Sequence, residues 1–412
     1  MPISMHTNNL NFFKDHVGIG FAILILFALF PLLVVVLIII FLLFNDKAQR
    51  NTYYFLFILL SIYLGLVNCT KLPDGDMVGY LEIFSRVPNY SFYDNVFMDK
   101  NLGMREPGFS FFNYLLYYLI LGDERWYIVI VTVIIYMFQF VALYLYWEKY
   151  GKNRSFVLMG VIILAFFPPY FNLSVHLIRQ MLAVSIMMYI LVLKTVKGTI
   201  NWLMLVVAVF VHTTVAIFVP ILFLQPLQKR ITLTSLWGVL AIILFIVFFG
   251  PYLSKIFESY LSFNSALSYG FNRINNSDSL DDGSMLNVLV MYLLLAPLLL
   301  LSFFVLFFEK DEEYGPLVLH SFYIFVSLVL MTSSVPLVQY RYFSFLYSYI
   351  PYFFPVLLKS PFVSDKRVFA AILVFFIINF FNKIESSVWR YAPILDLMSD
   401  NVFQLFFNRL HY

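Results

Sequence analysis

The residues best able to do chemistry in this chain are a few charged and histidine side chains among long apolar runs. Arg179 lies in the string HLIRQMLA, close behind His176. A guanidinium keeps its proton in proteins, and placing one at membrane depth costs at least about 2.5 kcal/mol. It needs a partner there, and its fork of donors suits phosphate. We interpret Arg179 as a ligand for a lipid phosphate or pyrophosphate. The alternative is an arginine that reaches from a helix end to the membrane interface.

Two acidic segments lie upstream of Arg179. Asp74 and Asp76 flank a glycine, and they could act on a substrate or simply form a turn, which Asp and Gly favour. Arg105 and Glu106 directly precede a proline, so they could contact a substrate or form a local ion pair at a helix start. Both segments supply groups that could bind cations or accept protons.

Three further candidates lie in apolar surroundings. His212 is followed by two threonines and could act as a base, or it could satisfy backbone groups where a helix is interrupted. Arg341 stands between two tyrosines, where it could bind an anion or anchor a helix at the interface. His176 could bind substrate or be an interfacial histidine with its hydrogen bonds satisfied.

Composition fixes the class of protein. The 412 residues are 62% hydrophobic and 12% charged, with a mean hydropathy of +0.87, whereas soluble domains are about 25% charged. Long uninterrupted apolar runs exclude a β-barrel, so we expect an all-α polytopic integral membrane protein. A net charge of +3 gives no sign of a nucleic-acid partner, and one cysteine excludes a disulfide framework. Phosphate-loop and dinucleotide motifs are absent from the sequence, and DGD lacks a matching metal-ligand set, so we expect no cofactor and no metal.

The chain is expected to form a single transmembrane domain over 1–412, with roughly 11 to 13 transmembrane or re-entrant helices. Two longer outer loops are predicted at 70–108 and 250–284, a short interfacial helix at 77–86, and an amphipathic tail at 382–412. The segment 109–121 is too short to cross comfortably. The predicted spans are 17–44, 53–69, 126–147, 155–171, 175–193, 231–249, 285–308, 316–335, 343–358 and 368–381.

The distribution of basic residues decides how 200–224 is interpreted. Lys and Arg concentrate in the short links that we assign to the cytoplasm. A single span over 200–224 would turn every later basic link outward. We therefore predict a helix broken near His212 that re-enters from the cytoplasmic side. All candidate site residues then face the outer side, with Arg341 in the link between two spans and Arg179 and His176 at the outer start of one helix.

Four strings, taken in order, resemble a known family. PDGDMVGYLEIF, REPGFSFFNYLLYYL, HLIRQMLAVSIMMYI and FVHTTVAIFVPILFL are similar to the EpsG-like family of Wzy-type bacterial surface polysaccharide polymerases, which make O-antigen, capsule or exopolysaccharide. The resemblance covers roughly residues 72–224, with a weaker echo in QYRYF around Arg341.

The resemblance implies a metal-independent glycosyltransferase in the bacterial inner (cytoplasmic) membrane, with its active site facing the periplasm or exterior. It would join undecaprenyl-pyrophosphate-linked oligosaccharide repeats among membrane lipids, with a flippase and a chain-length regulator as expected partners. Fixed cations must meet the charge that grows on a leaving pyrophosphate, and an acceptor hydroxyl needs a base. The candidates for substrate binding are Arg179, Arg105, Arg341, Asp74 and His176, and those for catalysis are Asp76, the first choice, with Glu106 and His212.

Two alternatives remain open. A membrane glycosyltransferase could add one sugar from a polyprenyl-phosphate donor. A flippase or transporter could use the same arginines only to bind a lipid-linked glycan. Clustering of charge on the outer side, rather than at the midplane, favours chemistry over transport.

Overall fold

The computed structural model describes residues 8–45, 48–98, 106–151, 154–229, 293, 295–302, 315–331, 336–359, 366–385 and 389–407. Every element in these ranges is a helix, which confirms the all-α prediction. The predicted span 231–249, the loop 250–284, most of 285–308 and Arg105 lie outside the described residues.

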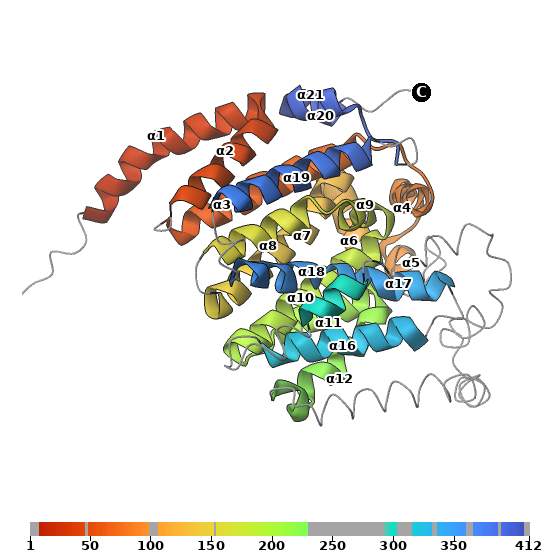
Figure 1. Ribbon diagram of the computed structural model, residues 1–412. Coiled ribbons are helices and arrows are strands. Elements are labelled where there is room, and N and C mark those ends of the chain that lie inside the picture. Colours follow the sequence, from red (N-terminus) through yellow and green to blue (C-terminus); the bar gives the residue numbers. More distant parts are fainter. Residues whose placement is uncertain are drawn as a thin grey trace, which may run out of the picture.

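Long apolar helices make this a polytopic membrane protein. Among the described residues, four helices are long and apolar enough to cross a bilayer, namely α3 (Arg50–Cys69), α7 (Glu124–Tyr150), α10 (Ile178–Lys197) and α19 (Lys366–Ile384). The pair α8 (Ser155–Ala165) and α9 (Pro168–His176) adds a fifth if it counts as one span bent by 57°. Helices α3, α7 and α10 form the centre of the bundle, where α7 contacts both α3 and α10 closely (Figure 1).

Prolines explain where two predicted spans were wrong, and a third predicted span is divided among shorter elements. The single span 17–44 is two helices, α1 (Asn8–Leu29) and α2 (Pro31–Phe44), because Pro31 has no N–H to donate and opens the second helix. Pro168 opens α9 in the same way, so 155–171 continues through a bend to His176, which lies in the last turn of α9 rather than at the start of α10. The span 343–358 is divided among three elements: α17 (Pro336–Tyr347), α18 (Ile350–Phe353) and the 3-10 helix Phe354–Lys359.

The predicted break near His212 is confirmed. Helix α11 (Trp202–Val211) stops at His212, whose backbone is extended at φ −154° and ψ 118°. A 3-10 turn (Thr213–Ile217) and α12 (Phe218–Phe223) follow. The rings of Trp202 and Phe223 stack with centroids 5.4 Å apart, so the segment returns to the end from which it started. It is a hairpin with His212 near its tip, and its entry from the cytoplasmic side stays a prediction.

Short helices cover the end of the bundle at which α10 begins. These are α4 (Asp76–Ser85), α5 (Phe92–Val96) and α6 (Pro107–Leu119), with α17 beside them (Figure 1, right). Helix α4 confirms that the predicted segment 77–86 is helical. Helix α16 (Pro316–Met331) matches the start of the predicted span 316–335.

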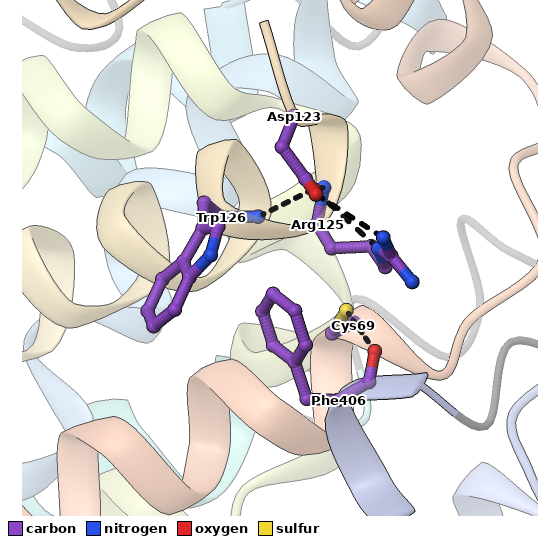
Figure 2. Close-up of polar contacts among 5 residues, drawn as sticks. All are labelled: Cys69, Asp123, Arg125, Trp126 and Phe406. Atoms are coloured by element: carbon purple, nitrogen blue, oxygen red, sulfur yellow. Dashed lines mark hydrogen bonds and ion pairs between the residues drawn. The ribbon is translucent and has the colours of Figure 1, made fainter. Parts of the chain in front are cut away.

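The tail forms two short helices, α20 (Ile394–Ser399) and α21 (Val402–Phe407), that pack against the bundle. Figure 2 shows Phe406 between Cys69 and the start of α7, where the Phe406 carbonyl accepts from the Cys69 thiol at 3.7 Å. The Trp126 and Phe406 ring centroids are 4.7 Å apart, and the Arg125 guanidinium lies 5.3 Å from the Phe406 ring. Asp123 caps α7 by accepting from the backbone N–H groups of Arg125 and Trp126.

Candidate functional site

Glu106 is the centre of a buried charged cluster. One carboxylate oxygen accepts from Arg179 Nη1 at 2.7 Å, and the other lies 2.5 Å from His212 Nδ1. The backbone N–H of Thr213 also donates to this carboxylate. The side chains of Glu106, Arg179 and His212 are 8%, 11% and 11% exposed. A carboxylate with this little water needs such partners, and here they come from two other helices.

Local sequence brings the three helices together. Glu106 precedes Pro107, which occupies the first position of α6 as its sequence predicts. A Cβ on Gly108 would come within 2.7 Å of the Phe210 carbonyl carbon, so only glycine allows α6 to pack this closely on α11. His212 then leaves α11 with extended backbone, two residues after that contact, and its ring reaches Glu106.

Arg179 lies in the first turn of α10, and two aromatic rings, those of Tyr80 and Phe109, lie close to its guanidinium. The Tyr80 hydroxyl accepts a hydrogen bond from Arg179 Nε at 3.3 Å. The guanidinium carbon lies 5.4 Å from the Tyr80 ring centroid and 5.9 Å from that of Phe109. Aromatic faces attract cations, so the two rings stabilise the positive charge of Arg179 and help to fix the orientation of its guanidinium.

The charges around Glu106 favour its ionised form. Burial by itself raises the pKa of Glu106, but the hydrogen bond and charge of His212, the charge of Arg179 and the Thr213 N–H outweigh it, so that the pKa lies below its usual 4.5. A carboxylate can only accept hydrogen bonds, so His212 must carry a proton on Nδ1. In the neutral ring, Nε2 is then the basic nitrogen.

A second charged cluster lies on the other side of the break between α9 and α10. Asp74 Oδ1 is 3.1 Å from His176 Nε2, and Asp74 Oδ2 accepts from Lys71 Nζ at 3.2 Å. Gly75 has φ +49° and ψ −130°, a conformation that non-glycine residues avoid. The predicted turn is therefore present, and it brings Asp74 to His176, three residues before Arg179 in the chain.

The remaining predicted site residues lie at different distances from these clusters. Asp76 is the first residue of α4 and is exposed. Arg341 lies within α17, not in a link between spans as predicted, because the helix already begins at Pro336. Its backbone carbonyl accepts from the Gln180 side chain at 2.6 Å, so α17 is attached next to Arg179. Arg105 lies outside the described residues, and the roles of all these groups stay predictions.

Sequence reasoning missed Lys71 and the contact between Tyr80 and Arg179. Lys71 is a basic residue three positions before Asp74 in an apolar setting, which was the available signal. Tyr80 lies one helical turn after Asp76, and its contact with Arg179 spans 99 residues of sequence. Within the described ranges, no group of three or more His, Cys, Asp and Glu side chains converges on a metal-sized site.

Together, the long apolar helices, the hairpin at His212 and the buried Glu106–Arg179–His212 cluster define a polytopic membrane protein with a charged site inside its helical bundle. A family model described as the EpsG family matches residues 72–393, and the chain belongs to this family. The matched range includes the described residues of both clusters except Lys71. Neither a curated protein nor a solved structure matches the chain. Membership of this family associates the chain with polysaccharide biosynthesis.

Proposed function

We propose that this protein polymerises undecaprenyl-pyrophosphate-linked oligosaccharide repeats, a glycosyl transfer at the outer face of the bacterial inner membrane. The observation that carries the proposal is the buried carboxylate of Glu106, which contacts both Arg179 and His212. One carboxylate thereby orients a fixed cation and a base side by side. Membership of the EpsG family supports the same class of reaction.

His212 is the base in this proposal. Its Nδ1–H donates to Glu106, which holds the ring in one tautomer, in the way that a buried carboxylate orients a catalytic histidine. Nε2 takes the proton from the acceptor hydroxyl while that oxygen forms a bond to the anomeric carbon of the donor glycan. This role replaces Asp76 as the first choice, because Asp76 is exposed at the start of α4 whereas His212 lies beside the buried arginine.

Arg179 serves the leaving group. The bond between the anomeric carbon and the pyrophosphate oxygen breaks, and its electron pair leaves on the lipid pyrophosphate. The guanidinium donates to Glu106 and to Tyr80, and these two bonds fix its orientation. Donors that are already fixed in place stabilise the developing charge without reorganising. Arg341, Arg105 and His176 are the further substrate contacts, Asp74 orients His176, and a flippase and a chain-length regulator are the partners.

Surface-glycan gels of a deletion strain complemented with variants test the proposal. Arg179→Ala and His212→Ala should abolish long chains while single repeat units still reach the surface. Arg86→Ala is the matched control for the arginine, because Arg86 pairs with Glu82 on the exposed side of α4. His320→Ala is the control for the histidine, because His320 is also buried, in α16, and its Nδ1 lies 2.8 Å from the Pro316 carbonyl oxygen of the same helix. Normal chain lengths in Arg179→Ala would contradict the proposal.

Purified protein in liposomes separates the alternatives. Longer glycans formed from a lipid-linked repeat support polymerisation. Addition of one sugar from a polyprenyl-phosphate donor would identify a decorating glycosyltransferase, and movement of the repeat across the membrane without elongation would identify a flippase.

A further inference from the structure

We infer that Lys71 is a positioning residue of the candidate site, and that it acts by tying the Asp74 turn to the backbone of residues 389–392, here called the strap. The inference rests on the proposed function, because the turn it positions contacts His176 beside Arg179. Nothing in the sequence pattern assigned a role to either Lys71 or the strap.

Lys71 is fully buried, which is unusual for lysine. Its side chain has 0% exposure, and its ammonium donates to Asp74 Oδ2 at 3.2 Å and to the Trp389 carbonyl at 2.6 Å. The Tyr391 ring lies 5.1 Å from Nζ. A buried ammonium persists only with such partners, so these three contacts locate its charge between the first loop and the strap.

The strap is attached to the first loop by backbone as well as by Lys71. The Leu72 N–H donates to the Arg390 carbonyl at 3.0 Å, and the Ala392 N–H donates to Thr70 Oγ1 at 3.4 Å. Arg390 holds φ +54°, a left-handed conformation that is strained for a non-glycine residue. A strained conformation persists where its surroundings over-determine it, and here the bonds to the first loop do so.

The consequence runs from the strap to the site through three contacts. The Trp389 carbonyl fixes Lys71, Lys71 fixes one oxygen of Asp74, and the other oxygen faces His176 at 3.1 Å. Without the ammonium, the Asp74 carboxylate would lose the cation on that side and the turn would lose its tie to the strap. A displacement of about 1 Å near a reacting centre can lower a rate by about a hundredfold.

The experiment compares Lys71→Met with wild type in liposomes supplied with a lipid-linked oligosaccharide repeat. Methionine keeps the length of the side chain and removes its charge. We expect kcat per folded protein to fall at least about tenfold, with no further fall when Asp74→Asn is added, because both substitutions break one chain of contacts. Lys149→Met is the matched control: Lys149 also donates to a backbone carbonyl, that of Val196, at 2.9 Å and lies 5.2 Å from a tyrosine ring, but at the opposite end of α10.

Each outcome has a distinct meaning. Elongation by wild type together with an unchanged kcat in Lys71→Met overturns the inference and leaves the proposed function standing. Absence of elongation by wild type overturns the proposed function, and the inference with it.

If Lys71→Met does not fold, Asp74→Asn alone carries the test, since it leaves Lys71 bonded to the strap. A similar fall in kcat then supports the inference, and a wild-type kcat overturns it. A role in folding alone would lower the melting temperature and leave kcat per folded protein unchanged.

Discussion

Stability measurements on Glu106 and Arg179 test directly whether these two side chains form one coupled unit. Their atoms are 2.7 Å apart, and the side chains are only 8% and 11% exposed. Removing one partner of a buried ion pair costs about 3–5 kcal/mol, because the other charge is left without compensation. Arg179→Ala should lie near the lower end, since Glu106 keeps His212 and Thr213 as donors. Glu106→Ala should lie near the upper end, since it removes the acceptor of all three.

The double variant decides the matter. The two losses should not add, and the coupling energy should be about 1–3 kcal/mol, within the range for residues of one network. Unfolding in mixed detergent micelles, followed by circular dichroism, provides the four free energies of the cycle. The exposed pair Glu82 and Arg86 is the control, and its variants should change stability by no more than about 1 kcal/mol. Additivity within about 0.5 kcal/mol for Glu106 and Arg179 would refute the coupled unit.

Three more outcomes are expected. The pKa of Glu106 is lowered from its usual 4.5, so its ionised form should stabilise wild type fully above that pH. The advantage of wild type over Glu106→Gln should disappear as the pH falls through the lowered pKa. Thermal unfolding in detergent measures this. Gly75→Ala should destabilise the protein by about 1–3 kcal/mol and shorten surface glycans, since φ is +49° there. Gly79→Ala, within the α4 helix that Gly75 precedes, should stabilise the protein by about 0.5–1 kcal/mol, since a Cβ there meets open space. Chemical unfolding of both variants measures the two changes. Arg179→Lys should fail to restore long chains on gels, because an ammonium cannot reproduce the fork that bonds Glu106 and Tyr80 together.

Hydropathy and the distribution of basic residues were sufficient to predict the helical class, the spans found as α3, α7, α10 and α19, and the break at His212. Apolar runs longer than about 17 residues have few solutions in a bilayer, and the asymmetry of basic links favoured a hairpin over a span at 200–224. The errors at Pro31 and Pro168 have one cause. A proline inside an apolar run does not lower the mean hydropathy of the run, so the hydropathy pattern does not reveal the helix break there. The break arises because proline has no N–H to donate.

The site was predictable in its residue types but not in its pairing. Glu106, Arg179 and His212 were each singled out, yet their convergence depends on how α6, α10 and α11 pack, which no local pattern states. Asp76 and Asp74 look equivalent in sequence. In the structure one is exposed at a helix start and the other lies between Lys71 and His176. Only the tertiary arrangement distinguishes them.

The bond between Lys71 and the Trp389 carbonyl joins groups separated by 318 residues, which has a consequence for biogenesis. A ribosome adding about 5–20 residues per second needs on the order of 15 to 60 seconds to cover that interval. During that time the early helices are already in the membrane, but the first loop still lacks its contacts with the strap. The contact between Lys71 and the strap can therefore form only after residues 389–392 have been made, so the Asp74 turn gains this support late in synthesis of the chain.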